Sequence, residues 1–395
     1  MARNAPLEPI LIAGGGIGGL SAAIALAQIG YSVRILEQAP KLSEAGAGIQ
    51  LSPNAVRLLQ GWGVAKRLRS RAVAPDRITL FDGTDGKALA DLTLGPAIAT
   101  RYGAPYWVVH RADLQKALLE TAGTFDGITV ETGFRLVSAD NSPAGVRAQS
   151  EDGRSAAGAA LIGTDGLWST CREIMGFDDE PRFSGRTAWR TLLPIEDAPP
   201  PFSTHATGLW LAPRSHLVHY PVSGGREINI VAIIEDAWHG QEWDVPGDAQ
   251  YLRDAFRDWA DVPRQVLDRT EVWRKWALFD RPALPHWSSG RMTLLGDAAH
   301  PMLPFLAQGG AMAIEDAASL ARAISNAPDD LPGAFFAYEK MRKNRTRRVQ
   351  LASRRMARIY HLGGLPAAFR NFALRASPPA WLLYQNDWIY KYVIE

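Results

Sequence analysis

The chain has 395 residues, of which 47% are hydrophobic and 21% charged, and its formal net charge at pH 7 is +2. This length exceeds what one small core requires, and it allows two substructures that share a ligand cleft. The near-balanced charge gives no strong electrostatic case for nucleic acid, so no nucleic-acid partner is expected.

The apolar residues and the one cysteine exclude further classes. No apolar run approaches the ~18 residues of a membrane span, and no long apolar segment precedes the first predicted strand. We therefore expect a cytoplasmic protein without membrane association. Cys171 stands alone, which excludes both a disulfide framework and a redox-active cysteine pair. No metal site is predicted.

The first predicted element is a nucleotide-binding strand–turn–helix unit. The apolar strand 10–13 leads into three glycines, Gly14, Gly16 and Gly19, which fit the pattern G-x-G-x-x-G before an apolar helix. These glycines allow a tight turn, an approach of pyrophosphate to the helix N-terminus, and close helix–strand packing. The next strand ends in Glu37, where a carboxylate can bond the ribose hydroxyls of an adenosine.

The middle of the chain predicts an antiparallel sheet. Residues 77–81 and 88–94 read as a hairpin, and a helix over 113–122 follows. Four later strands are punctuated by prolines, and a helix and a final strand close the block. Those four strands are predicted at 183–193, 204–211, 216–221 and 227–234, the helix at 249–259 and the final strand at 273–280. Three further strands, near 128–133, 134–140 and 144–149, precede this block and lead to the Asp-Gly segment at 165–166.

A second ligand-binding segment begins at Asp297. It follows a strand-like segment and runs through Pro301 and Pro304 to the pair Gly309-Gly310, which opens an Ala-rich helix. A carboxylate at a strand end can accept hydrogen bonds from a ribityl hydroxyl. A glycine pair at a helix start lets backbone N–H groups approach a flavin or a pyrophosphate.

A third segment makes the combination specific. The strand 160–163 is followed by Asp165-Gly166, Ser169 and Arg172. With the glycine loop, the segment at 296–297 and His110-Arg111, the order resembles the class A flavoprotein aromatic monooxygenases, the group of p-hydroxybenzoate and salicylate hydroxylases. The resemblance covers residues 9 to about 325.

The resemblance implies an α/β fold: a Rossmann-like FAD-binding domain interleaved with an antiparallel-sheet substrate domain, followed by a helical C-terminus. The boundaries are expected at 1–75, 100–180 and 285–330 for FAD, 76–99 and 181–284 for the substrate sheet, and 331–395 for the helical segment. The implied FAD ligands are Gly14, Gly16, Ile17, Gly19, Glu37, Gln38, Gly48, Arg111, Asp165, Asp297, Pro301, Gly309, Gly310 and Ala311.

The resemblance also implies the reaction. The glycine pattern does not recur between 150 and 300, so NADH or NADPH would dock transiently rather than on a second Rossmann domain. The enzyme would hydroxylate a small phenolic or N-heteroaromatic ring, carrying a carboxylate, through a C4a-hydroperoxyflavin formed with dioxygen. The alternatives are a larger polyketide-like or quinone-precursor ring, or an FAD-binding electron-transfer protein that hydroxylates nothing.

The catalytic candidates lie on one predicted strand. Alternation places His216 and Tyr220 on one face and His219 on the other. A histidine and a tyrosine in a cleft could bind and deprotonate a phenol, because histidine titrates near neutrality. The competing interpretation is a buried histidine and a packed tyrosine, and for His219 that interpretation is favoured.

Other substrate contacts are expected at the pocket wall. Arg190 and Arg214 could each anchor a carboxylate, or could simply be exposed. By resemblance Pro304 and Phe305 would border the substrate, Pro301 would face the flavin, and His300 would hold the flavin loop.

The C-terminal region predicts a basic amphipathic helix between 335 and 358, followed by an aromatic-rich tail. The cations could meet a membrane surface or steer anionic substrates and nicotinamide phosphates. A solvated helix face packed on the flavin domain is favoured. The tail could cover the pocket or form the interface of a homodimer.

Overall fold

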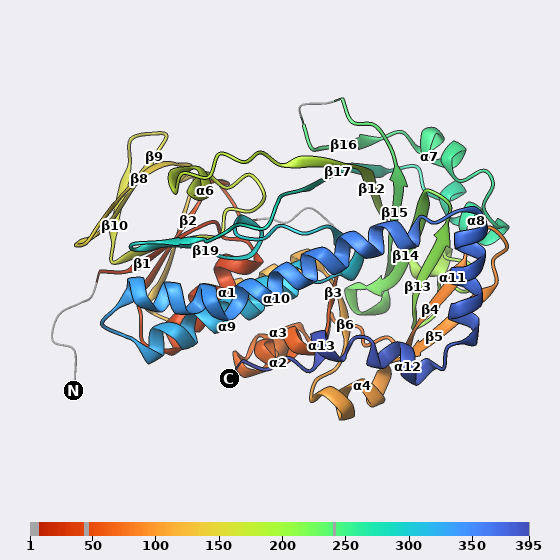
Figure 1. The fold of residues 1–395 in the computed structure, drawn as a ribbon, viewed down its shortest axis with the longest axis horizontal. Helices are drawn as coiled ribbons and strands as arrows, with labels where there is room; N and C mark the ends of the chain where they lie inside the picture. The colour runs from red at the N-terminus through yellow and green to blue at the C-terminus, as the bar shows by residue number, and fades with distance from the viewer. Residues whose placement is uncertain (1–7, 43–46, 240–241, 395) are drawn as a thin grey trace.

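The first apolar strand lies at the centre of a six-stranded sheet (Figure 1). In the computed structural model, which describes residues 8–42, 47–239 and 242–394, β1 (Ile10–Ala13) pairs in parallel with β2 (Val33–Glu37) and β11 (Ala160–Gly163). These apolar runs are buried on both faces, as their sequences predicted. The strand order is β18 (Ser288–Ser289), β19 (Met292–Leu294), β11, β1, β2 and β7 (Ile128–Thr132).

A second sheet holds eight strands. Their order is β16 (Asp244–Gly247), β17 (Trp273–Asp280), β12 (Arg182–Pro194), β15 (Glu227–Glu235), β14 (Ser215–Val222), β13 (Thr207–Ala212), β4 (Arg77–Asp82) and β5 (Ala88–Thr93). The predicted antiparallel sheet needs one correction, because β13 and β4 run parallel. These two strands come from distant parts of the chain, so no hairpin forces them to be antiparallel.

The remaining strands form two small sheets. The antiparallel sheet β10 (Ser155–Gly158), β9 (Gly145–Ser150), β8 (Leu136–Ser142) contains two strands that were predicted and one that was not. The antiparallel pair β3 (Gly48–Leu51) and β6 (Trp107–His110) forms the second small sheet.

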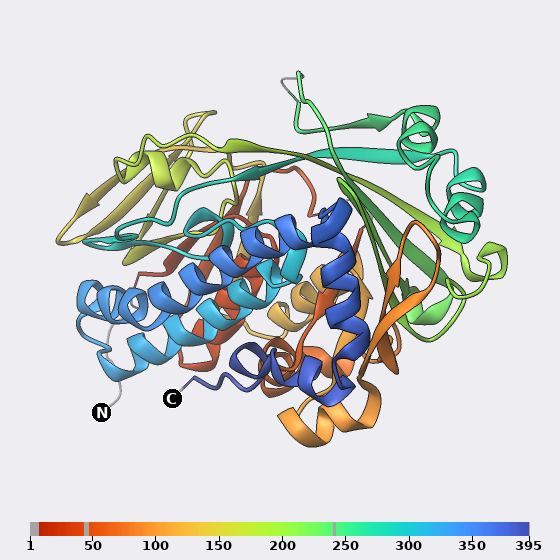
Figure 2. The ribbon, with the colours of Figure 1, turned by 45° about the vertical axis from the view of Figure 1, so that its right-hand side comes forward.

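The helices pack on and around these sheets. In the main core, α1 (Ile17–Gln28) packs between α9 (Gly309–Asn326) and α5 (Arg111–Ala122), and α2 (Pro53–Gly61) also packs on α9. Figure 2 shows α11 (Gly364–Ala376) and α12 (Pro379–Tyr384) over the edge of the eight-stranded sheet, beside β5. The remaining helices are α3 (Val64–Leu68), α4 (Gly95–Tyr102), α6 (Thr170–Ile174), α7 (Ala249–Ala255), α8 (Asp261–Asp268), α10 (Leu331–Tyr360) and α13 (Asp387–Tyr390).

The helix predicted over 249–259 is wrong in its length. The chain leaves the helix at Phe256, and the backbone N–H of Ala260 donates to the carbonyl of Gly83. A new helix, α8, then starts with Pro263 in its first turn, where the ring and the missing N–H are tolerated. Both short helices cover the outer face of the eight-stranded sheet, where they bury a second core.

The predicted basic helix is part of α10, which runs from the six-stranded sheet toward the eight-stranded sheet (Figure 1). Its inward face is charged as well as apolar. Arg342 is fully buried and binds Asp316 of α9 at 2.6 Å and Glu315 at 2.6 Å. Arg345 also binds Glu315 at 2.7 Å. Part of the basic pattern therefore joins two helices, rather than facing solvent. No helix among the described residues is long and apolar enough to cross a membrane.

Candidate active site

A cleft of about 390 Å³ follows the carboxyl ends of the parallel strands, the edge at which α/β sheets bind ligands. Four segments meet there because their strands are neighbours: the glycine loop after β1, the end of β2, the turn after β11 and the loop after β19. The predicted cofactor residues that line the cleft are Gly14, Gly16, Ile17, Glu37, Gln38, Arg111, Asp165, Asp297, Gly309 and Gly310.

A close approach of backbone explains one of the glycines, and a side-chain contact bears on a second. At Gly19, a Cβ would lie 1.9 Å from the carbonyl oxygen of Gly14, so α1 could not pack on the loop with any other residue. At Gly310, a Cβ would lie 2.7 Å from Cδ1 of Ile49, which closes the other side of the cleft. The first two backbone N–H groups of α9 point out of its N-terminus beside this cleft, a favourable position for a flavin carbonyl or a phosphate.

Two carboxylates stand at opposite ends of the cleft. Glu37 is fixed by accepting hydrogen bonds from the backbone N–H groups of Gly15 (2.6 Å) and Ala39 (2.7 Å). Asp297 faces the cleft near Gly309. The surrounding protein desolvates its carboxyl and raises the pKa of Asp297, while Arg111 and His300 oppose that shift. Two hydroxyl-binding carboxylates and a glycine-lined floor fit an extended FAD.

The Asp165 segment joins two of the loops. Asp165 accepts hydrogen bonds from the Ser169 hydroxyl (2.6 Å) and the Cys171 backbone N–H (2.9 Å), which orders the start of α6. Arg172 is buried, pairs with Asp179 and donates to the carbonyl of Ala298. The segment therefore holds the loop after β19 in place as well as lining the cleft.

Four predicted cofactor residues do not line the cleft. Gly19 acts through the packing of α1, and Ala311 is buried inside α9. The N–H of Gly48 donates to Asn229 at 2.7 Å, and a Cβ there would collide with the Tyr220 ring. The carbonyl of Pro301 accepts from Gln350 at 2.8 Å, so this proline ties its loop to α10.

The inner face of the eight-stranded sheet presents unpaired donors beside Gly48. Tyr220 lies opposite Asn229. Arg190 lies on the neighbouring strand β12, opposite Val231, which is two residues from Asn229 on the same face. The Nε atom of Arg190 and the Nδ2 atom of Asn229 are buried and have no hydrogen-bond partner among the described residues. Burial lowers the pKa of Arg190, whereas Tyr220 raises it. Burial also raises the pKa of Tyr220.

His216 lies on the same face as Tyr220, four residues away along β14, and one nitrogen of its ring already has a hydrogen-bond partner. Its Nδ1 is 2.8 Å from Nε2 of His361, the residue that follows the end of α10. Arg186 donates from Nε to Nδ1 of His361 at 3.3 Å, which assigns the His361 proton to Nε2 and leaves Nε2 of His216 protonated. Burial, with His361 and Arg186, lowers the pKa of His216 well below its usual value. Burial also lowers the pKa of His361 to about 3. Both rings are therefore neutral at pH 7.

Comparison with known proteins places this cleft and sheet in a family. Residues 8–350 match the model of the FAD binding domain family. The chain is 38% identical to the 3-hydroxybenzoate 6-hydroxylase of Polaromonas naphthalenivorans (strain CJ2), over 99% of this chain and 97% of that protein. The chain belongs to the class A flavoprotein aromatic monooxygenases.

Two further relatives agree with this assignment. The 6-hydroxynicotinate 3-monooxygenase of Bordetella bronchiseptica (strain ATCC BAA-588 / NCTC 13252 / RB50) is 36% identical over 87% of this chain and 90% of its own length. The structure of Klebsiella pneumoniae HpxO complexed with FAD and uric acid superposes with a TM-score of 0.84 at 26% identity, covering 97% of each chain. This class A monooxygenase therefore binds FAD, uses NAD(P)H as co-substrate and hydroxylates aromatic rings, and its predicted α/β fold is confirmed.

One predicted substrate residue of the monooxygenase is misplaced. Arg214 sits at the turn between β13 and β14 with φ of 61°, and its side chain is 78% exposed and paired with Glu235 at 3.2 Å. A residue at the apex of a hairpin points away from the sheet, so Arg214 does not reach the inner face. His219 lies on the outer face, where it stacks on Phe202 and accepts from Trp210 at 3.1 Å.

The loop after Asp297 reaches both sheets of the monooxygenase. Phe305 is buried and packs against His216 with a centroid distance of 5.2 Å, whereas Pro304 is partly exposed. His300 binds Asp316 at 2.5 Å. Burial raises the pKa of Asp316, but His300 and Arg342 outweigh it and lower that pKa to about 2. His300 thus holds the loop, in agreement with the expected structural role.

Sequence reasoning missed three residues of this site. Asn229 alternates with apolar residues in β15, and a polar residue on a buried strand face was an available signal. His361 follows the basic helix and lies 145 residues from its partner His216, so no local pattern pairs them. Arg342 was read as one cation among many, although it is the fully buried one that neutralises Asp316 and Glu315.

Proposed function

We propose that this monooxygenase hydroxylates a small phenolic or N-heteroaromatic ring that carries a carboxylate. The observation that carries the proposal is the pair of buried, unpartnered donors at Arg190 and Asn229 beside Tyr220. A buried donor without an acceptor is costly, and a carboxylate would satisfy both donors at once. By their names, the Polaromonas 3-hydroxybenzoate 6-hydroxylase and the Bordetella 6-hydroxynicotinate 3-monooxygenase act on hydroxybenzoate and hydroxynicotinate, which are rings of this kind.

His216 is proposed to contact the opposite end of the ring. Four residues along a strand span about 13 Å, so Tyr220 and His216 flank a ring-sized ligand rather than both touching one atom. In the assigned tautomer, Nε2 of His216 is a donor. It would stabilise a phenolate oxygen, and the neutral His361 behind it would fix that tautomer. We expected His216 to be a proton acceptor; the network favours a donor that stabilises the ionised ring.

The other groups hold the cofactor and exclude water. Glu37, Asp297 and the N-terminus of α9 would hold FAD, which supplies the redox chemistry when bound. Phe305 and Ile49 contribute apolar surface beside it, and excluding water from such a site protects a reactive oxygen species.

Substrate binding tests this proposal before any turnover. Holoprotein would be titrated with matched ring pairs that differ only in the carboxylate, and the perturbation of the flavin absorbance would give each Kd. We expect the carboxylated member to bind roughly 10- to 100-fold more tightly, since hydrogen bonds to charged groups contribute about 1.5–3 kcal/mol. Equal affinity of the two members would overturn the carboxylate assignment.

Location and assembly are also proposed. A free, buried cysteine and the use of NAD(P)H support a cytoplasmic location. A homodimer is supported by the exposed apolar face of α11 and α12, where Phe369, Phe372, Trp381 and Tyr384 are 73%, 68%, 51% and 47% exposed. These four rings offer roughly 500 Å² per copy, so a two-fold contact would reach the ~1,000 Å² of a specific interface.

A further inference from the structure

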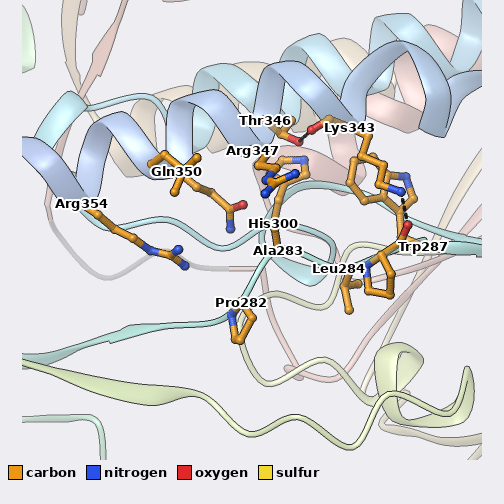
Figure 3. A pocket seen from close by; sticks show the side chains of 12 residues that line it. Pro282, Ala283, Leu284, Trp287, His300, Lys343, Thr346, Arg347, Gln350 and Arg354 are labelled. Carbon is orange, nitrogen blue, oxygen red and sulfur yellow. Dashed lines mark hydrogen bonds between the residues drawn. The ribbon is translucent and has the colours of Figure 1, made fainter.

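A second cavity, of about 490 Å³, lies between α10 and the segment that connects β17 to β18 (Figure 3). Its upper wall is α10, with Lys343, Arg347 and Arg354, and its lower wall runs from Pro282 to Trp287. It shares no lining residue with the FAD cleft. The reaction of the monooxygenase needs a second, anionic dinucleotide, and the chain has one glycine loop, which FAD takes.

The cationic wall is not neutralised. Arg354 pairs with Asp280, and Lys343 donates to the carbonyl of Pro285. Arg347 has no hydrogen-bond or ion-pair partner among the described residues, and Figure 3 shows its guanidinium directed into the cavity. Three cations thus face one carboxylate, and an anion placed there would gain hydrogen bonds as well as charge.

Buried polar atoms around the cavity also lack partners. Nδ1 of His300, Oε1 of Gln350 and Nε1 of Trp287 have no hydrogen-bond partner among the described residues. All three side chains line the cavity and are at most 2% exposed. Such groups carry a desolvation cost unless a ligand or water satisfies them. The cavity therefore combines charge with donors and an acceptor suited to a phosphate and a ribose.

One loop forms a wall of both sites. Asp297 lines the FAD cleft and His300 lines the second cavity, and three residue steps span at most about 10 Å. Gln350 of α10 donates to the carbonyl of Pro301, and this hydrogen bond fixes the loop directly after His300. A dinucleotide bound in the cavity would lie one loop away from the flavin.

We propose that this cavity binds the adenosine diphosphate portion of NADH or NADPH, with Arg347 as the principal phosphate ligand. The proposal rests on the function given above, because it assigns a place to the co-substrate of that reaction. It differs from a general steering role for the basic helix, because it names one cavity and one cation.

The test is direct binding of ADP-ribose, a probe that cannot reduce the flavin. Calorimetric titration of the FAD-loaded protein in a phosphate-free buffer would give the Kd for wild type, Arg347→Glu and Arg322→Glu. The last variant makes the same charge change on exposed α9, outside the cavity. We expect Arg347→Glu to weaken binding at least about tenfold and Arg322→Glu to leave it within twofold.

Anaerobic flavin reduction by NADH and by NADPH provides the second measurement. In Arg347→Glu, the concentration for half-maximal reduction should rise at least about tenfold, while the limiting rate and the FAD content stay within twofold. Inorganic phosphate should compete weakly with ADP-ribose in wild type. An unchanged Kd and an unchanged half-saturating concentration in Arg347→Glu would overturn the site. A wild-type protein that binds ADP-ribose but hydroxylates no aromatic ring would contradict the proposed function and leave the dinucleotide site intact.

Discussion

At the scale of single residues, the inner face of the eight-stranded sheet carries buried hydrogen-bond donors that have no acceptor among the described residues. Arg190 stacks on Trp276, with its guanidinium carbon 4.8 Å from the ring centroid, and keeps a buried Nε without a partner among the described residues. A cation in this setting is stabilised by an anionic ligand more strongly than an exposed arginine would be. The sequence predicted two arginines, Arg190 and Arg214, as candidates to bind a substrate carboxylate. The structure distinguishes the two, because Arg190 lies within β12 on the inner face whereas Arg214 lies at an exposed turn.

Replacing Arg190 tests that role. Arg190→Met should raise the KM for a carboxylated ring roughly 10- to 100-fold, because one charge-assisted contact is lost, and should change kcat less. Arg182→Met on the exposed start of the same strand is the matched control, and should leave KM unchanged. Steady-state kinetics with FAD-saturated protein would show this. An unaltered KM in Arg190→Met would contradict the anchor.

The buried histidines predict how stability depends on pH. Burial lowers the pKa of His219 to about 3, below its value of ~6.5 in an unfolded chain. Below pH ~6.5 the unfolded state therefore binds one more proton at this site than the folded state, so stability falls as the pH falls. His219→Phe should reduce the loss of unfolding free energy between pH 6 and 5 by about 1.2 kcal/mol, because the imidazole of the unfolded chain is already mostly protonated at pH 6. Denaturant midpoints at the two pH values would measure it, and an identical pH dependence in both proteins would refute the neutral, buried state of His219.

At the scale of elements, α9 and α10 are joined by a buried ionic network rather than by apolar contacts alone. Arg342 binds both Glu315 and Asp316, and Asp316 in turn binds His300 and the N–H of Gly296. Removing one partner of a buried ion pair leaves an uncompensated charge, which costs about 3–5 kcal/mol. The network therefore links the stability of the long helix to the position of the flavin loop.

Arg342→Met should lower the melting temperature by several degrees and reduce FAD retention, because Asp316 loses its counter-charge and the loop loosens. Arg355→Met, on the exposed face of the same helix, is the control and should change neither. Thermal unfolding and the ratio of flavin to protein absorbance would be measured together. If Arg342→Met matched wild type in both, the network would not hold the loop.

The sequence predicted the elements near the cofactor more completely than those near the substrate. The glycine loop, Glu37, Asp165 and Asp297 each sit at a strand end, and a local pattern suffices to place them on one edge of a parallel sheet. The pairing of His216 with His361 depends on how α10 crosses the second sheet, which no local pattern encodes. Likewise, the end of α7 at Phe256 depends on the contact of Ala260 with Gly83, a tertiary interaction that outweighs helix propensity. The domain boundaries stay a prediction.

At the scale of the whole molecule, the exposed apolar face of α11 and α12 predicts the assembly. Phe369→Ser combined with Phe372→Ser should convert a dimer into a monomer, because it removes the two most exposed rings of the face. Light scattering coupled to size exclusion would report the mass. The double change Val130→Ser with Val137→Ser, on exposed strands far along the chain, is the control. A wild type that is monomeric at micromolar concentration would contradict the proposed homodimer.

The central claim concerns the reaction as a whole: NAD(P)H, dioxygen and a carboxylated ring meet at the FAD cleft beside Arg190 and His216. The most direct test is turnover of the FAD-saturated protein under ¹⁸O₂ with a panel of hydroxylated aromatic and heteroaromatic acids. The product mass would be determined alongside the consumption of NADH or NADPH. The account predicts that one acid stimulates consumption and yields a ring product carrying one ¹⁸O atom. Consumption that no ring stimulates, or that yields hydrogen peroxide and an unlabelled ring, would contradict it.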